Sequence, residues 1–300
     1  MNVSCTAANS FTELTGFGTA YMRAIESARD DCVYNDPFAG LLTQRNRNEL
    51  EKFLKGTAEQ GVRWENLIAI RSRYVDDALE HRGSGTKQVV ILGAGLDTRA
   101  YRLLSLRECH VLEIEQNSQA FDHKAEVLQD APLMARKLDC IVANLADDDW
   151  DHKLLAHGFD SSLPTFWVME GLLPHMDRSS ITTMLDTVDA LSAPGSELWA
   201  DIAGHATFAV EGFGDVTMKY AEDDPLHGVL REIPWCLKLQ ASLGEEGVHF
   251  GRKSTPLSSS DTGESVPVWF VVGKKPIPTE AREKDVCPGL DYGGSFVQRI

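Results

Sequence analysis

The feature that most constrains this fold is a run of aliphatic residues that leads directly into a glycine-rich turn. Residues 89–99 read Val-Val-Ile-Leu-Gly-Ala-Gly-Leu-Asp-Thr-Arg. A short, continuously apolar run bounded by glycine is typical of a buried strand in a parallel sheet. Gly93 and Gly95 allow a sharp turn into a helix and a close approach of a ligand to main-chain atoms. A plain strand-to-helix turn, with Asp97 or Thr98 capping the helix, explains the same residues.

From this turn onward, strand-like runs alternate with helical patterns. We expect strands over 88–92, 110–115, 138–142, 165–170 and 197–202, separated by helices over 98–106, 118–129, 151–157 and 179–191. Alternation at this spacing predicts a doubly wound α/β sheet with helices on both faces. Residues 10–85 show helical spacing instead, which predicts a helical N-terminal extension.

The last third of the chain is less regular. We expect a helix-like segment over 208–220, an amphipathic segment over 235–243, an exposed loop over 254–265 and a final apolar strand over 266–272. Residues 204–252 are expected to form a lid-like insertion that closes over a ligand site. The tail after Pro276 is expected to be partly unstructured.

The charge of the chain excludes some classes of partner. The 300 residues carry 29 Lys plus Arg against 45 Asp plus Glu, a formal charge of −16. Such a chain repels phosphate backbones and anionic lipid surfaces, so we expect neither nucleic acid nor a membrane as a partner. The six cysteines lack metal-ligand spacing and the first residues lack a signal-peptide pattern, which predicts no metal site and a cytoplasmic protein.

Glu115 strengthens the interpretation of the glycine turn as a ligand site. It follows Gly95 by twenty residues and ends the next predicted strand. A carboxylate at this place accepts hydrogen bonds from the ribose hydroxyls of a dinucleotide or an adenosyl ligand. Position 98 is Thr where the dinucleotide fingerprint has its third glycine, which favours an adenosyl ligand over a nicotinamide or flavin.

Several longer blocks, spread over residues 17–203, make the sequence resemble one family. Among them are Arg71-x-Arg73-Tyr74-x-Asp76, Gly93-Ala94-Gly95-Leu96-Asp97-Thr98-Arg99 and Glu170-Gly171-Leu172-Leu173. On these blocks the chain resembles the leucine carboxyl methyltransferase family of S-adenosylmethionine (SAM)-dependent O-methyltransferases. The resemblance implies a Rossmann-like class I methyltransferase fold, a mostly parallel seven-stranded sheet with an antiparallel last strand. Residues 1–85 would be a helical extension of the same domain, 86–275 the SAM-binding core with the lid, and 276–300 a C-terminal tail.

The resemblance also implies which residues bind the cofactor. Arg71 would hold the SAM carboxylate, because a guanidinium offers that group a fork of donors. The other implied positions are Gly93, Ala94 and Gly95 beneath the methionine portion, Glu115 and Gln116 at the ribose, Asn144 and Leu145 at the adenine, Glu170 at the amino group or sulfonium, and Arg23 in the entry region. An ordinary surface arginine is the alternative interpretation of Arg23.

The sequence departs from the family pattern at several of these positions. Asn144 stands where Asp is common, and its amide oxygen can accept from the adenine amine only without charge assistance. After Glu115 the chain reads Gln116-Asn117 in place of x-Pro. His175 replaces a tyrosine-like position, where it would act as a general base or substrate donor, or merely line the pocket.

The implied reaction is methyl transfer from SAM to a carboxylate or phenolic hydroxyl of a small molecule, with S-adenosylhomocysteine as the product. A phenol with a pKa near 10 benefits from a base such as His175, whereas a carboxylate is already ionised at pH 7. The alternatives are methylation of a protein C-terminal leucine carboxylate, a SAM-binding protein without turnover, and a nicotinamide-binding Rossmann protein. The oligomeric state stays open.

Overall fold

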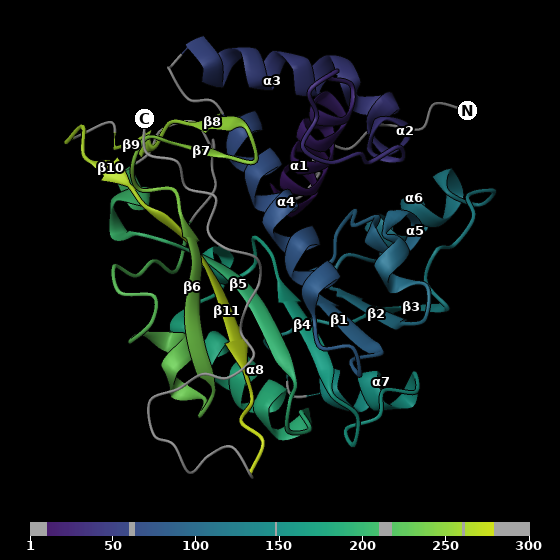
Figure 1. Cartoon of the computed structure of the whole chain (residues 1–300). Helices are drawn as coiled ribbons and strands as arrows, with labels where there is room; N and C mark the ends of the chain where they lie inside the picture. The colour runs from purple at the N-terminus through teal and green to yellow at the C-terminus, as the bar shows by residue number, and fades with distance from the viewer. Residues whose placement is uncertain (1–10, 60–63, 148, 210–217, 260–261, 279–300) are drawn as a thin grey trace.

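A seven-stranded sheet forms the centre of the molecule, with helices on both faces and a helical layer at one end (Figure 1). The computed structural model describes residues 11–59, 64–147, 149–209, 218–259 and 262–278. The strand order is β3-β2-β1-β4-β5-β11-β6. Strands β1 to β5 pair in parallel, and β11 is antiparallel to both of its neighbours. The predicted α/β fold with an antiparallel last strand is confirmed.

The strands follow the aliphatic runs of the sequence. The five parallel strands agree with the predicted ranges to within one residue at either end: β1 (Gln88–Leu92), β2 (His110–Glu115), β3 (Lys137–Val142), β4 (Thr165–Met169) and β5 (Glu197–Ala203). The later strands are β6 (Cys236–Ser242), β7 (Gly247–His249), β8 (Arg252–Ser254), β9 (Leu257–Ser258), β10 (Ser265–Val266) and β11 (Val268–Lys274).

The helices divide into a layer at the end of the sheet and connections between strands. The layer contains α1 (Phe11–Ser27), α2 (Ala39–Thr43), α3 (Arg47–Glu59) and the start of α4 (Trp64–His81), which continues over one face of the sheet. The connections contain α5 (Arg99–Arg102), α6 (Ser118–Val127), α7 (Trp150–Ala156) and α8 (Arg178–Leu191). Asn117 and Asp177 accept backbone N–H bonds at the starts of α6 and α8, which satisfies donors that a helix leaves free.

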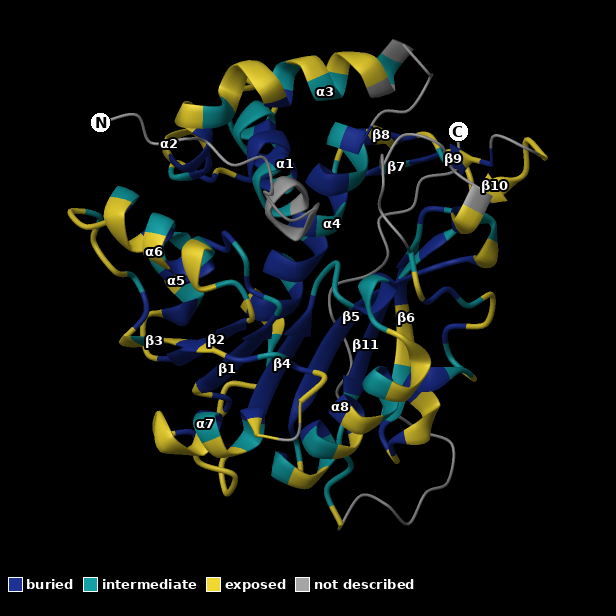
Figure 2. Cartoon of the chain, turned by 180° about the vertical axis from the view of Figure 1, so that it is seen from behind, coloured by how far each residue is buried: buried dark blue, intermediate teal, exposed yellow. Residues whose placement is uncertain are grey.

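Alternation along each strand produces two cores, one on each face of the sheet. In β1, Val89 and Ile91 pack with Tyr74 of α4, whereas Val90 and Leu92 pack with residues of α7 and α8 such as Leu185. Figure 2 shows the central strands β1, β2, β4, β5 and β11 as a buried layer between these helices, whereas the edge strands β3 and β6 carry exposed residues. The helix α4 therefore lies directly over one face of the sheet, and its side chains reach the ends of the central strands.

Several expectations for the less regular segments are corrected. Residues 235–243, predicted to belong to the lid, contain β6, which is an edge strand of the central sheet. The predicted exposed loop over 254–265 contains β9 and β10, with Ser254, Leu257 and Ser259 buried. The predicted helix over 98–106 ends after Arg102, because Leu103 is extended. Of the predicted helix over 208–220, residues 210–217 lie outside the described residues, and His205–Ala209 is a 3₁₀ turn.

The β7–β8 hairpin ties the last third of the chain to the helical layer. Arg252 donates to Glu26 of α1, with 2.7 Å between Nη2 and Oε1. The Tyr74 hydroxyl of α4 lies 2.9 Å from Nδ1 of the buried His249. Two helices that come early in the sequence are therefore held in place by residues more than 170 positions later.

Candidate functional site

The glycine turn after β1 and the end of β2 meet at one point. Gly93 and Gly95 have φ angles of 69° and 49°, which favour glycine because other residues rarely adopt the left-handed region. The Gly95 N–H donates to Oε2 of Glu115 at 3.0 Å, and the Asn117 N–H donates to Oε1 at 2.9 Å. Two backbone donors thus hold the Glu115 carboxylate, which is 7 % exposed, against the turn.

The two glycines differ in the space beside them. A Cβ atom at Gly95 would have no neighbour within 4 Å, so a ligand can approach the main chain there. A Cβ atom at Gly93 would lie 3.0 Å from Cδ1 of Leu172. The Leu172 side chain therefore covers Gly93, and the open approach to the turn is at Gly95.

Arg71 joins α4 to the ends of β4 and β5. Its Nε donates to Oε1 of Glu170 at 3.0 Å, and its Nη1 donates to Oδ2 of Asp201 at 3.1 Å. The Gly171 N–H donates to the other oxygen of Asp201 at 2.6 Å. Gly171 has a φ of 63°, and a Cβ there would lie 3.1 Å from Arg71 Nη1. Glycine at 171 thus makes room for the guanidinium.

Further ion pairs extend this cluster toward the glycine turn and α1. Arg99 pairs with Glu170 at 2.7 Å, and also with Asp76 and Asp97. Arg23 of α1 is buried, pairs with Asp36 at 3.0 Å and donates to the Leu96 carbonyl at 2.6 Å. The surface alternative for Arg23 is therefore wrong. The buried ion-pair network contains four guanidiniums and five carboxylates, a formal excess of one negative charge, at Arg23, Arg71, Arg99, Arg102, Asp36, Asp76, Asp97, Glu170 and Asp201.

Burial and neighbouring charges shift the pKa values of two carboxylates in this network in opposite directions. Burial alone would raise the pKa of Glu170, but Arg99 and Arg71 hold it below its usual value. At Asp201 burial outweighs the attraction of Arg71, and the pKa is raised. The charged form of Glu170 is therefore favoured in spite of its burial, as are those of Asp36 and Asp97, whose pKa values are also lowered.

The predicted adenine residues, Asn144 and Leu145, and the predicted cofactor residue Gln116 do not join this network. Asn144 accepts from the Ala146 N–H at 3.1 Å and donates to Asp147 at 3.1 Å, so its amide stabilises its own turn. Leu145 is buried in the core. Gln116 is exposed beside Glu115. All three follow the ends of β2 or β3, at the same edge of the sheet as the glycine turn.

His175 lies at the end of the 3₁₀ turn Leu173–His175, which follows Glu170. It is half-buried, and burial together with Arg71 and Lys219 lowers the pKa of its imidazole. The Lys219 N–H donates to the Pro174 carbonyl at 2.7 Å, which places residues 219–220 against this turn. His175 is therefore neutral at pH 7 and able to accept a proton.

Sequence reasoning considered Asp97 only as a helix cap and assigned no role to Asp201, Asp76 or Arg99, although the structure joins all four to the Arg71–Glu170 pair. Asp76, Asp97 and Arg99 occur in the quoted motifs. Asp201 had its own signal, since it is an acid inside the apolar strand Leu198-Trp199-Ala200-Asp201-Ile202. A carboxylate in such a run is buried, and it needs a partner.

A family model described as "Leucine carboxyl methyltransferase" matches residues 16–189 of this chain. The chain belongs to the leucine carboxyl methyltransferase family. Two relatives, both named "Putative S-adenosyl-L-methionine-dependent methyltransferase", support this membership. One from Rhodococcus jostii is 34 % identical over 71 % of this chain and 72 % of its own length. One from Streptomyces coelicolor is 29 % identical over 83 % of this chain and 91 % of its own length.

Solved structures agree on the fold. A structure described as a "putative methyltransferase" from Thermobifida fusca has a TM-score of 0.54 at 15 % identity, over 92 % of this chain and all of its own. A "duf574 family protein" from Streptomyces avermitilis has a TM-score of 0.52 at 14 % identity, over 87 % of this chain and 97 % of its own. The family match and the relatives identify the chain as a methyltransferase, and these structures show that its fold has the class I architecture.

The described residues lack two further features, a membrane-spanning helix and a cluster of metal ligands. Within them, no helix is both long and apolar enough to cross a membrane. Nor do three or more His, Cys, Asp or Glu side chains in the described ranges gather as metal ligands would.

Proposed function

We propose that this family member transfers the methyl group of SAM to an oxygen atom of a small molecule, a carboxylate or a phenol. One observation carries the proposal: the glycine turn with Glu115 and the Arg71–Glu170–Asp201 cluster lie at the carboxyl ends of β1, β2, β4 and β5. In open α/β sheets, ligands bind at this edge. The products would be a methyl ester or ether and S-adenosylhomocysteine.

The residues present suit SAM in charge and in donor set. SAM carries a carboxylate, an ammonium and a sulfonium, a net positive charge that matches the negative excess of the ion-pair network. Nε and Nη1 of Arg71 are bonded to Glu170 and Asp201, and Nη2 has no hydrogen-bond partner among the described residues. We assign Nη2 to the ligand carboxylate. Glu115, held from behind by two N–H groups, would accept from the ribose hydroxyls.

The remaining assignments follow the order of the strands. Glu170, whose pKa is lowered by Arg99 and Arg71 against the effect of burial, would attract the ammonium or sulfonium. Asn144 and Leu145 after β3 would border the adenine, with the Asn144 amide acting mainly through the turn that it stabilises. When bound, SAM supplies an electrophilic methyl group, so the protein's task is to align the acceptor and exclude water.

The acceptor decides whether His175 takes part in the chemistry. A carboxylate is ionised at pH 7 and attacks without a base. A phenol, with a pKa near 10, needs to lose its proton, and the neutral imidazole of His175 is suited to take it. The name of the family model suggests a second candidate acceptor, the carboxylate of a C-terminal leucine.

Calorimetric titration with SAM, S-adenosylhomocysteine and NADH tests the cofactor. We expect binding of the first two and none of NADH; binding of NADH alone would overturn the proposal. A screen with methyl-labelled SAM then compares small carboxylic acids, phenols and a peptide ending in leucine. Label transfer to the peptide alone would replace the small-molecule acceptor with a protein C-terminus.

A further inference from the structure

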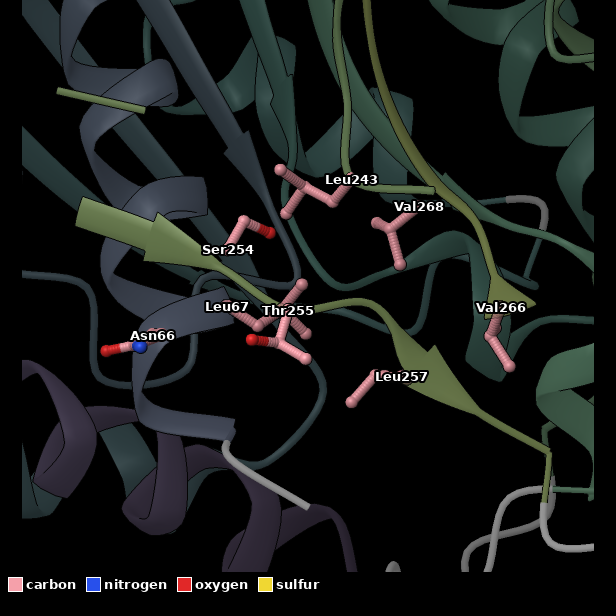
Figure 3. A pocket seen from close by; sticks show the side chains of 8 residues that line it. All are labelled: Asn66, Leu67, Leu243, Ser254, Thr255, Leu257, Val266 and Val268. Carbon is pink, nitrogen blue, oxygen red and sulfur yellow. The ribbon is translucent and has the colours of Figure 1, made fainter. Parts of the chain in front are cut away.

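A small pocket with aliphatic and uncharged polar lining residues opens between α4 and the late strands (Figure 3). Its volume is about 50 Å³. Five aliphatic side chains line it: Leu67, Leu243, Leu257, Val266 and Val268. Leu257 and Val266 are paired across the β9–β10 sheet, so they form one wall together. The lining contains no charged side chain, and its polar members are Asn66, Ser254 and Thr255.

The pocket adjoins the Arg71–Asp201 contact along two separate elements. Leu67 precedes Arg71 by four residues on α4, so the two side chains lie on the same helix face, about 6 Å apart along the axis. Val268 is paired with Ala203, which lies two residues beyond Asp201 on the same face of β5, about 7 Å along the strand. Leu67 on α4 and Val268 on β11 therefore both lie next to the residues of the Arg71–Asp201 ion pair.

Most of the pocket lies outside the segment that this chain shares with the family model. The model matches residues 16–189, which include Asn66 and Leu67. The other six lining residues follow position 242. The glycine turn, Glu115 and the Arg71–Glu170 pair therefore lie within the matched segment, whereas the pocket is built mainly by strands that follow it.

We propose that this pocket binds the apolar end of the methyl acceptor, a branched or cyclic hydrocarbon group of about three to five carbons. The inference rests on the methyl transfer proposed above. A cavity of about 50 Å³ has room for roughly three to five water-sized groups, at about 10 to 15 Å³ for each. It is far smaller than a site for a whole ligand, so it selects one part of the acceptor.

The position of the pocket defines the shape of that acceptor. Its apolar group would lie between α4 and the β9–β10 sheet, and its oxygen would extend past Arg71 toward Glu170. A hydrocarbon gains free energy in this lining because it leaves water without displacing any ion pair. An acceptor without such a group would leave the pocket empty and bind more weakly.

The first test measures binding, so it does not depend on turnover. Two matched pairs of probes are 3-methylbutanoate with acetate and 4-isopropylphenol with phenol, and the members of each pair differ by three carbons. Each buried carbon should tighten binding about four-fold, or about 60-fold for three. The full chain, labelled with ¹³C at Leu and Val methyl groups, should show shifts at the five lining residues with the branched probe only, with or without S-adenosylhomocysteine.

Variants then separate the pocket from the rest of the surface. Thr255 is exposed at the rim, so Thr255→Phe should fill the mouth and reduce the 60-fold preference to less than 5-fold. Ser258→Phe places the same ring on an exposed position of β9 outside the lining and should leave the preference intact. Leu257→Ala, which widens the pocket, should favour 4-cyclohexylphenol over 4-isopropylphenol.

The outcomes distinguish the two proposals. Equal binding within each pair, or methyl shifts confined to other residues, would overturn the pocket proposal even where SAM binds and label is transferred. Pocket shifts with the expected preference, in a protein that binds no SAM, would instead contradict the proposed reaction. Steady-state turnover on the same probes should follow their binding. In Thr255→Phe, the KM for the branched acceptor should rise, whereas the KM for SAM should stay unchanged.

Discussion

Arg71 and Glu170 lie 99 residues apart in the chain, yet an ion pair of 3.0 Å joins Nε of one to Oε1 of the other. Asp201 completes the arrangement by pairing with Nη1 of the same guanidinium. The cation is thus neutralised and oriented by the ends of two strands before any ligand arrives. A ligand carboxylate would meet a guanidinium whose direction is already set, which lowers the entropic cost of binding.

Loss of this guanidinium should weaken SAM binding. Arg71→Ala removes a charged hydrogen bond to the ligand and is expected to cost about 1.5 to 3 kcal/mol, or about 10- to 150-fold in Kd. Titration calorimetry measures the change. Arg73→Ala, on the same helix and paired with Asp77 at 3.6 Å, is the matched control and should stay within about two-fold. An unchanged Kd for Arg71→Ala would show that the arginine has only a structural role.

The Glu115 side chain should act on the nucleoside half of the ligand. Glu115→Gln keeps the shape but loses the charge, and one of the two N–H groups of Gly95 and Asn117 loses its acceptor. We expect affinity for SAM and for 5′-methylthioadenosine to fall together by about 10-fold or more. Arg71→Ala should leave 5′-methylthioadenosine unaffected, because that molecule has no carboxylate. If both variants weakened both ligands equally, the assignment of separate halves would be refuted.

His175 should control the pH dependence for phenolic acceptors only. Burial, Arg71 and Lys219 place its pKa below the usual 6.5, so the imidazole is neutral, and able to act as a base, at higher pH. As the pH falls through that lowered pKa, it gains a proton and kcat/KM for a phenol should decrease. The carboxylate reaction should show no such dependence. His175→Ala should lower kcat for phenols alone, with His152→Ala, an exposed histidine, as the control.

Glycine should be required at position 93 both by its positive φ angle and by the closeness of the Leu172 side chain. Gly93→Ala forces a side chain into a φ of 69° and places its Cβ 3.0 Å from Leu172. The left-handed conformation costs about 1 to 2 kcal/mol, so the free energy of unfolding in urea should fall by at least that amount. Gly85→Ala, with no atom within 4 Å of its Cβ and no positive φ, should change it by less than about 0.5 kcal/mol. A double variant with Leu172→Ala should recover only the part due to crowding.

The central strands could be predicted from local pattern because each is short, aliphatic and bounded by turn residues. The strand β6 could not, since its exposed Lys238 and Leu239 give no clear alternation and a bulge interrupts its pairing with β11. The short strands β9 and β10 also lack a clear local pattern, because each has only two residues. Of their four residues, only Leu257 and Val266 are buried, whereas Ser258 and Ser265 are exposed.

In the site, individual motifs could be predicted from the sequence, but the contacts between residues far apart in the chain could not. Glu115 could be linked to the glycine turn because it ends the next predicted strand, and the Gly95 N–H does donate to its carboxylate. Asp201 and Arg71 are separated by 130 residues, and no local rule links an acid in β5 to an arginine in α4. Asn144 shows the opposite case, because its sequence position suggested a ligand contact while its amide bonds lie within its own turn.

The contact between Glu26 and Arg252 also has a consequence for synthesis of the chain. The two residues are 226 positions apart, so α1 lacks this ion pair until Arg252 has left the ribosome. At about 5 to 20 residues per second, that interval is about 11 to 45 s. Throughout this time α1 lacks the ion pair between Glu26 and Arg252. The ion pair that joins α1 to the β7–β8 hairpin therefore forms long after α1 itself has been made.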